Sequence, residues 1–524
     1  MGSESRKHVT IMDTTLRDGE QTSGVSFVPH EKLILARALL LNAKVNRIEV
    51  ASARVSDGEK EAVSKICAWA KSENLLNSIE VLGFVDGPQS IEWIRESGCK
   101  RMNLLCKGSL RHCQNQLSKT PDEHLHDIQE SIRLAREADI QVNLYLEDWS
   151  NGIKDSEEYV YYMMDHLKDS GVGRFMLPDT LGILTPQSTF QFVRKMVERY
   201  PSSGFDFHAH NDYDLAVANA MAAVEAGATG LHTTINGLGE RAGNAPLASV
   251  QAALRDHYNA ETDIQENKLT EISHLVESYC GIAIPPNKPV VGDSVFTQVA
   301  GVHADGDNKS GLYCNNLLPE RFGRKREYAL GKNSGKANIL RNLEELGLAL
   351  TPEQTKAVTK RIIELGDKKE IVTQDDLPYI VADIVKHSAP DDRVKLDSYL
   401  VSTSYGLKPL ASVRVEVNGE CFEETATGDG QYDAFVRAVR HIYREKLGRK
   451  FPWLTNYAVS IPPGGRTDAL VQTCISWSFD GKNFRTRGLD ADQMESAIKA
   501  TFKLLNIIED LYEQAPERTK EKIQ

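Results

Sequence analysis

Two histidines stand two positions apart in the segment FHAHND, residues 207–212. In a β-strand, residues two apart point to the same face, so His208 and His210 would aim at one point. Neutral imidazole is the commonest metal ligand among side chains, and two such rings could share one ion. For an isolated pair, two core or surface histidines with satisfied hydrogen bonds are the more ordinary interpretation. The elements that position the pair must therefore decide between a shared metal ion and two unrelated histidines.

The N-terminal half alternates short apolar runs with segments long enough for a helix, which predicts parallel strands buried on both faces. Two of the separators carry clear helix signals. Thr120 and Pro121 mark the start of a helix over residues 120–138, and Gly227 marks the end of one over 215–226. The strand-like runs begin at Val9, Arg47, Ile79, Arg101, Gln141, Arg174, Phe205 and Leu231.

Eight β-α repeats in roughly 260 residues predict an α/β fold, a (β/α)8 TIM barrel. The alternative, a doubly wound open sheet, requires a glycine-rich phosphate turn after the first strand, and TTLRDGEQ is not one. We expect this catalytic barrel over residues 8–284 and linker subdomains, with a helix at 352–387, over 285–390. A C-terminal α+β domain over 391–513 follows, with a charged tail. No internal repeat is evident beyond the barrel units.

Composition excludes several classes of function. A net charge of -12 argues against nucleic-acid or anionic-membrane partners. No apolar run approaches the roughly 20 residues of a membrane span, and the N-terminus lacks a signal core. Its Met-Gly-Ser start nominally resembles a myristoylation site, from which Arg6 departs. Eight scattered cysteines without a C-x-x-C pair predict free thiols and a cytoplasmic protein.

In a TIM barrel, chemistry takes place at the carboxyl ends of the strands. The predicted strand ends there bring together a carboxylate, two imidazoles and an amide oxygen, a set that can bind one divalent ion and leave positions open. Oxygen-rich ligation with two histidines suits Zn²⁺, Mn²⁺ or Mg²⁺. We therefore predict that His208 and His210 share a metal with Asp18, and that Asn244 belongs to the same set.

Other polar residues at the strand ends each have two interpretations. Glu147 is either the N-cap acid of the next helix or a catalytic carboxylate. Arg17 is either a rim salt bridge or a group that holds an oxyanion or carboxylate. The segment NGLGERAGN is either a flexible turn or a source of groups, Asn236 and Glu240, that orient the metal ligands.

Four motifs, DTTLRDGEQ, HAHNDYDLAVAN, NGLGERAGN and GVHADG, resemble those of the acyl-CoA-condensing metallo-enzymes of the 2-isopropylmalate, citramalate and homocitrate synthase family. The resemblance covers nearly the whole chain. It implies an aldol-type condensation of acetyl-CoA with a 2-oxo acid, followed by thioester hydrolysis. It also implies a homodimer in which GVHADG reaches the partner's active site, and a C-terminal domain that binds an amino-acid effector.

By motif match, the resemblance assigns a role to each residue of the site. It implies Asp18, His208, His210 and Asn244 as metal ligands, Arg17 as the group that stabilises the developing alkoxide, and Thr180 as the partner of the substrate carboxylate. The candidates for proton transfer are Glu147, His303 and Tyr313. Without the resemblance, His303 would be interpreted as an exposed loop histidine.

The substrate side chain is expected to meet Leu82, Leu105 and Tyr145, three bulky residues that leave room for the methyl group of pyruvate. The alternative is that these residues are ordinary barrel core. NLLCKGSL after the fourth strand and YLEDWSNG after the fifth also resemble citramalate synthases. The expected product is (R)-citramalate, in isoleucine biosynthesis. The alternative is 2-isopropylmalate, from 2-oxoisovalerate, in leucine biosynthesis.

Two glycine-rich segments, GDGQYDAF at 428–435 and PPGGRTDALV at 462–471, resemble effector-binding segments of the family. Isoleucine would be the effector of a citramalate synthase and leucine that of an isopropylmalate synthase. Both segments could instead be hairpin turns and helix starts. Two rival functions are a 3-hydroxy-3-methylglutaryl-CoA type lyase, which would resemble only the barrel half, and a catalytically silent amino-acid sensor.

Overall fold

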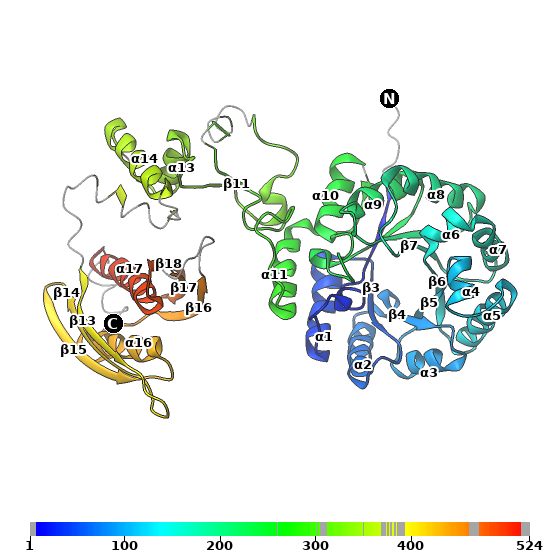
Figure 1. Ribbon diagram of the computed structural model, residues 1–524, viewed down its shortest axis with the longest axis horizontal. Coiled ribbons are helices and arrows are strands. Elements are labelled where there is room, and N and C mark those ends of the chain that lie inside the picture. The colour runs from blue at the N-terminus through cyan, green and yellow to red at the C-terminus, as the bar shows by residue number, and fades with distance from the viewer. Residues whose placement is uncertain are drawn as a thin grey trace. The chain divides into compact units, whose positions relative to one another are not determined.

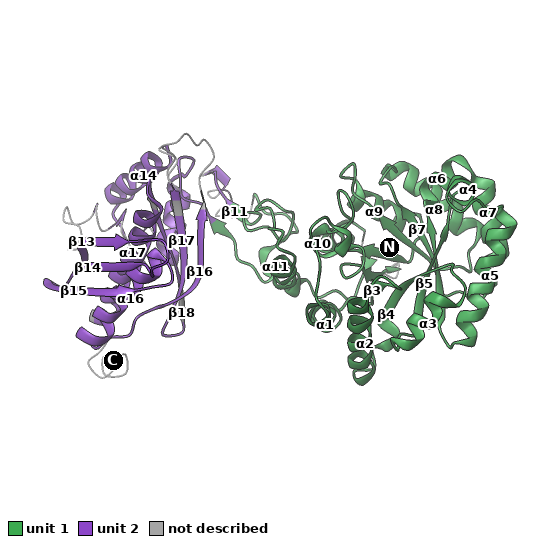
Figure 2. Cartoon of the chain, turned by 60° about the horizontal axis from the view of Figure 1, so that its bottom comes forward, with its two compact units in different colours: residues 1–297, 311–327 green, residues 298–310, 328–524 purple. Residues whose placement is uncertain are grey.

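The computed structural model describes residues 7–258, 260–300, 302–303, 306, 312–348, 350–367, 372, 374, 377, 380–381, 384, 393–460 and 471–514. The chain forms two compact units, shown in different colours in Figure 2. Unit 1 comprises Met1–Thr297 and Gly311–Glu327, and unit 2 comprises Gln298–Ser310 and Tyr328–Gln524. Within these ranges, no helix combines the length and apolar character that crossing a membrane requires. The expected three-domain boundaries stay a prediction.

Unit 1 contains a closed parallel barrel, which confirms the TIM barrel and excludes the open sheet. Closure is direct, because the first barrel strand pairs with the last, Thr10 lying opposite Gly230 and Asp13 opposite Thr233. Among the described residues the barrel strands are β2 (Thr10–Asp13), β3 (Arg47–Ser52), β4 (Ile79–Phe84), β5 (Arg101–Lys107), β6 (Gln141–Glu147), β7 (Phe175–Asp179), β8 (Phe205–Ala209) and β9 (Gly230–Thr233).

Helices surround this barrel, as Figure 1 shows in blue, cyan and green. Thr120 caps α5 as predicted, since its hydroxyl accepts a hydrogen bond from the Glu123 amide at 3.3 Å. Gly227 ends α9 in the left-handed region, with φ 118°. The helices are α1 (Pro29–Arg37), α2 (Asp57–Ser72), α3 (Pro88–Glu96), α4 (Leu110–Asn115), α5 (Pro121–Glu137), α6 (Trp149–Asp155), α7 (Glu157–Leu167), α8 (Pro186–Arg199), α9 (Ala216–Ala226), α10 (Leu247–His257) and α11 (Leu269–Cys280).

Side chains alternate between two cores along the barrel strands. On β5, Leu104 belongs to the large core that the strands form with the surrounding helices. Its neighbour Leu105 packs against a separate small cluster inside the barrel. That inner cluster consists of Met12, Leu82, Tyr145 and Met176. The two faces of one strand therefore serve different purposes.

The barrel interior also holds paired charges. Arg47 bonds to Glu80 at 3.1 Å and to Asp206 at 2.5 Å, and all three side chains are buried. Asp206 lies 3.3 Å from Nε2 of His232, whose Nδ1 lies 3.3 Å from the Tyr145 hydroxyl. These hydrogen bonds satisfy groups that would otherwise be costly to bury.

Short strands β1 (Lys7–His8) and β10 (Ala260–Glu261) pair beside the barrel, and the chain passes between the units in β11 (Thr297–Gln298) and β12 (Glu327–Tyr328). In unit 2, α13 (Lys336–Glu345) and α14 (Pro352–Asp367) share a small apolar core. The helix expected over 352–387 is described as α14 up to Asp367, and most of its remainder lies outside the described residues.

The C-terminal part of unit 2 is an α+β domain, as predicted. It contains two three-stranded antiparallel sheets, each followed by a helix: β13 (Val394–Ser402), β14 (Leu410–Val417), β15 (Glu420–Thr427) and α16 (Gln431–His441), then β16 (Trp453–Ser460), β17 (Val471–Phe479), β18 (Lys482–Asp490) and α17 (Gln493–Gln514). This βββα arrangement recurs, which is a repeat of topology that the sequence did not predict. The two halves share topology and differ in sequence, so no repeated pattern was visible.

Candidate active site

Three buried side chains from two barrel strand ends form one cluster of metal-ligand type. Asp18 follows β2, and His208 and His210 lie at the end of β8. The Nε2 atoms of the two histidines are 3.3 Å apart, and Oδ2 of Asp18 lies 3.4 Å from the first and 3.8 Å from the second. The spacing of the two histidines thus brings both rings to one point, as the sequence suggested.

Asn244 lies beside this cluster, because it forms an isolated bridge with His210. Its Nδ2 donates to the Leu238 carbonyl at 3.1 Å, while its Oδ1 is buried and accepts no hydrogen bond from a described residue. A cation is one way to satisfy such an oxygen. Gly239 makes room here, since a Cβ on it would lie 2.1 Å from Asn244 Nδ2 at a φ of +152°.

Electrostatics keep the cluster in a metal-binding protonation state. Burial lowers the pKa of His208, and burial together with His208 lowers the pKa of His210 to about 4. Burial alone would raise the pKa of Asp18, yet the Arg17 guanidinium and His208 hold it well below its usual range. One carboxylate and two neutral imidazoles are the donors that a divalent cation requires. The residues present therefore fit the metal.

Arg17 is fixed by partners on both sides. Its Nε donates to Glu49 at 2.6 Å, and its Nη1 donates to Asp18 at 3.0 Å. The second oxygen of Glu49 accepts a hydrogen bond from Asn103 at 2.8 Å. Glu49 was missed from the sequence, although a charged residue inside the apolar run RIEVAS is a signal for an inward-facing ion pair.

A cavity of about 190 Å³ lies above the cluster and brings most of the predicted residues together. The β5–β6 register aligns Leu105 with Tyr145, and the β4–β5 register aligns Leu105 with Phe84. Four lining residues were not predicted, Gln21, Ser52, Phe84 and Pro178. The predicted residues in the lining are Arg17, Asp18, Leu82, Leu105, Tyr145, Glu147, Thr180, His208, His210 and Glu240.

Glu147 enters this lining from the end of β6. It is ion-paired with Lys107, which the sequence interpretation also missed. Asp148, and not Glu147, occupies the N-cap position of α6. The Thr180 hydroxyl accepts a hydrogen bond from the Asp148 amide at 2.9 Å. Glu147 is thus available for a role other than capping.

Four predicted residues are not among those that line the cavity, including Asn244, which lies beside the metal cluster. Tyr313 is 45% exposed in unit 1, and His303 belongs to unit 2. The resemblance assigned the segment of His303 to the active site of a partner chain. Asn236 donates to the Ser273 carbonyl at 2.9 Å, and so it ties its turn to α11.

A second cavity of about 300 Å³ shares Arg17, Gln21 and Ser52 with the first. The second cavity therefore lies next to the first, on the side of Arg17. The lining on this side is mostly polar and charged, including Glu20 and Glu59.

Comparison with family models accounts for nearly the whole chain. A model described as HMGL-like matches residues 8–276. One described as homocitrate synthase post-HMGL domain-like matches 290–370, and one described as the LeuA allosteric (dimerisation) domain matches 371–509.

Two relatives from Methanocaldococcus jannaschii align with almost the full length. The chain is 35% identical over 508 residues to a 2-isopropylmalate synthase, covering 95% of this chain and 94% of that protein. It is 33% identical over 502 residues to an (R)-citramalate synthase, covering 95% and 99%. A solved HMG-CoA lyase from Bacillus subtilis matches at 21% identity and a TM-score of 0.45, covering 53% of this chain and 96% of that one.

Proposed function

Because the chain belongs to the acetyl-CoA-condensing family of 2-isopropylmalate and citramalate synthases, we propose that it condenses acetyl-CoA with pyruvate. The products are (R)-citramalate and CoA. The observation that carries this choice is the small inner cavity, with Leu82, Leu105 and Tyr145 in its lining. The matches over 290–509 to synthase-type domains favour synthesis over cleavage by a lyase.

The small size of the cavity favours pyruvate over 2-oxoisovalerate as the substrate. The volume of about 190 Å³ is shared with the metal cluster and with Glu147 and Thr180. Leu82 and Tyr145 are themselves buried, at 5% and 4% exposure, and packed against Met12 and Met176. Overpacking such a site costs about 1–3 kcal/mol, so an isopropyl group would be rejected where a methyl group fits.

Asp18, His208, His210 and Asn244 would hold a divalent metal, which supplies Lewis-acid polarisation of the substrate carbonyl. We propose that Thr180 hydrogen-bonds to the substrate carboxylate through its hydroxyl.

Arg17, held in place by Glu49, is positioned to stabilise negative charge that develops at the former ketone. Its fixed guanidinium needs no rearrangement when that charge appears. Acetyl-CoA would approach through the second cavity, on the Arg17 side.

The candidates for proton transfer are Glu147, Tyr313 and His303, and His303 would come from the GVHADG segment of a partner chain. Glu147 lines the cavity and is ion-paired with Lys107. The resemblance supports the contribution in trans, and the match to a dimerisation domain supports a homodimer. Cytoplasmic localisation is proposed from composition and from the free cysteines.

The C-terminal domain is proposed to bind isoleucine as a feedback effector, since its sequence matches an allosteric domain. The glycine-rich segment 428–435 precedes and begins α16. The other segment, 462–471, lies almost entirely outside the described residues. The alternative function, 2-isopropylmalate synthesis with leucine as effector, is favoured by the 35% identity to the M. jannaschii enzyme of that name.

Free thiol release from acetyl-CoA tests the proposal directly. Purified protein with Mn²⁺ or Mg²⁺ is given pyruvate or 2-oxoisovalerate in parallel, and kcat/KM is compared. A preference for pyruvate of about tenfold, equivalent to about 1.4 kcal/mol in the transition state, is expected. A preference for 2-oxoisovalerate would replace the proposal with the alternative. Metal content together with this thiol release separates an enzyme from a silent sensor.

A further inference from the structure

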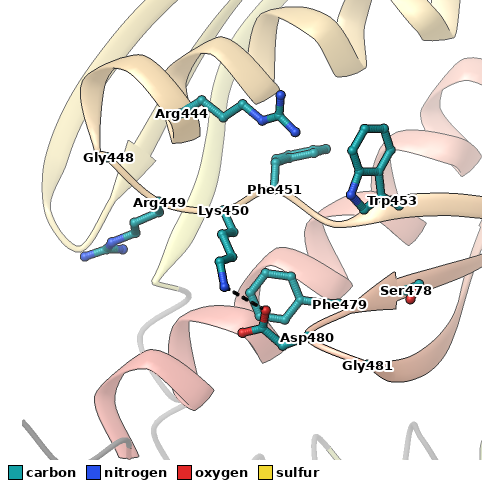
Figure 3. A pocket seen from close by; sticks show the side chains of 10 residues that line it. All are labelled: Arg444, Gly448, Arg449, Lys450, Phe451, Trp453, Ser478, Phe479, Asp480 and Gly481. Carbon is teal, nitrogen blue, oxygen red and sulfur yellow. Dashed lines mark hydrogen bonds and ion pairs between the residues drawn. The ribbon is translucent and has the colours of Figure 1, made fainter. Parts of the chain in front are cut away.

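A cavity of about 530 Å³ opens in the C-terminal domain, and Figure 3 shows the residues that line it. It lies between the segment that joins α16 to β16 and the turn between β17 and β18. No described residue of its lining comes from the segments 428–435 or 462–471, which carry the proposed amino-acid effector site. The cavity is therefore a separate candidate site, of a size typical for drug-sized ligands.

The basic side chains of the lining differ in how they are paired. Arg449 is ion-paired with Glu509, and in Figure 3 its guanidinium points away from the other labelled side chains. Lys450 is paired with Asp480 at 3.1 Å. Arg444 makes neither an ion pair nor a hydrogen bond to any described residue, so its charge is available to the cavity.

A second guanidinium lies beside Arg444. Arg440, one helical turn earlier, likewise has no ion pair or hydrogen bond among the described residues, and burial together with Arg444 lowers its pKa. Like charges four positions apart on a helix repel each other. An anion between or near the two guanidinium groups would relieve that repulsion, so this arrangement favours a negatively charged ligand.

Aromatic rings surround the two guanidinium groups. The guanidinium carbon of Arg444 lies 5.6 Å from the centroid of the Trp453 ring, and that of Arg440 lies 5.9 Å from it. Phe451 and Phe479 are buried in the lining, whereas Trp453 is 62% exposed. Figure 3 shows Arg444 reaching toward Phe451 and Trp453. An exposed indole next to guanidinium planes is a platform on which a flat ring can stack.

We propose that this cavity binds a nucleoside 5′-phosphate, with its base stacked on Trp453 and its phosphate paired with Arg444. Arg440 lies outside the lining and adds positive charge one helical turn away. Guanidinium groups are well suited to phosphate, because they can donate two parallel hydrogen bonds. Stacking tolerates any base, since every base has a π-face. Gly448 and Gly481 border the cavity with open space where a Cβ would stand, which allows a ligand close to the backbone.

Calorimetric titration of the full chain, without substrates, tests the proposal with three probes: AMP, adenosine and inorganic phosphate. AMP should bind, and adenosine and phosphate should each bind at least about tenfold more weakly, because each offers only half of the contacts. The absence of AMP binding, or equal affinity for AMP and adenosine, would overturn the proposal. Condensation activity does not enter the measurement, so its outcome is independent of the proposed enzyme function.

Variants separate this site from general electrostatic attraction. Arg444→Gln should weaken AMP binding by about tenfold or more while leaving adenosine unchanged, and Trp453→Leu should weaken both. The matched control is Lys446→Gln, which removes one charge from the same turn. Lys446 pairs with Glu424 at 3.0 Å and lies outside the lining, so AMP binding should stay within about twofold.

Two further results would contradict the proposal. Equal weakening by Arg444→Gln and Lys446→Gln would show that net charge alone attracts AMP. Sedimentation of the same variants tests whether a second copy of the chain, and not AMP, occupies the cavity. If Arg444→Gln converts a dimer to monomers and the unmodified chain does not bind AMP, a second copy of the chain covers the cavity.

Discussion

Glu49 holds Arg17 inside the barrel through a hydrogen bond of 2.6 Å from the arginine Nε to the carboxylate. Both side chains are buried, and the second oxygen of Glu49 is occupied by Asn103. Arg17 also contacts Asp18, so the group proposed to stabilise developing charge is tied directly to a proposed metal ligand. The orientation of Arg17 therefore depends on a residue that does not line the cavity around the metal cluster.

Replacing Glu49 by glutamine should slow the condensation without abolishing substrate binding. The variant keeps the size of the side chain and removes the charge that orients Arg17, so kcat for thiol release should fall by about 10- to 100-fold, with a smaller change in KM. The matched control is Glu80→Gln, another buried carboxylate that bonds to an arginine, Arg47. Equal losses of kcat in the two variants would argue against the positioning role.

Replacing His210 by glutamine should remove the metal. One of the three clustered donors is lost, so the affinity for the metal should fall by about tenfold or more. Less metal should therefore remain bound after dialysis. The control is His232→Gln, because His232 is also buried and its ring centroid lies 5.5 Å from that of His208. Full metal occupancy in His210→Gln, measured by atomic emission, would exclude His210 as a ligand.

Shortening Leu105 should broaden substrate use. Leu105→Ala enlarges the inner cavity, so the ratio of kcat/KM for 2-oxoisovalerate to that for pyruvate should rise by about tenfold, or about 1.4 kcal/mol. The control is Leu104→Val on the opposite face of the same strand, where the side chain belongs to the outer core. That change should lower stability and leave the ratio unaltered. If both variants shift the ratio alike, the cavity does not select the substrate.

The free energy of unfolding should depend on pH in part through the titration of Asp13. Burial raises its pKa from 3.8 to about 7, and the side chain is fully buried. Between these values the folded chain keeps a proton that the unfolded chain has released. The stability contributed by Asp13 therefore falls, by on the order of a few kcal/mol, as the pH rises from about 4 to 7. Above about pH 7 this contribution stays constant.

Asp13→Asn removes this titration and should flatten the corresponding part of the curve. The quantity to compare is the free energy of opening of β2, from hydrogen exchange in denaturant between pH 5 and pH 8. The control is Asp139→Asn, an exposed aspartate whose removal should not change the slope. A slope that survives Asp13→Asn would assign the effect to another group.

Local signals predicted the barrel well because each acts over a few residues. Thr120, Pro121 and Gly227 bound their helices as expected, and the apolar runs became the barrel strands. His208 and His210 were found because a strand puts alternate residues on one face. None of the eight cysteines forms a disulfide, as their scatter suggested.

Features that depend on pairing between distant segments were not predicted. Glu49 is ion-paired with Arg17, and Lys107 is ion-paired with Glu147. In both pairs the partner is remote in sequence, so the strand that carries Glu49 or Lys107 does not reveal the pairing. In the C-terminal domain the sequence shows strand-like runs only in YLVSTSY, ASVRVEV and LVQTCISWSF, which fall in or overlap β13, β14 and β17. Strands β15, β16 and β18 were missed. The polar run ECFEETAT in β15 has few apolar residues, since much of this strand is exposed.

Side chains along β5 alternate between the outer core and the cavity, so substitutions that affect stability and substitutions that affect the cavity fall at different positions. Leu104 supports the fold, whereas Leu105 faces the cavity, and Val81 with Leu82 and Leu144 with Tyr145 repeat this division on the neighbouring strands. A new substrate could therefore arise through substitutions at a few inward positions while the outer core stays intact. Such a division would make the barrel evolvable, because its stability and its proposed choice of substrate rest on different side chains.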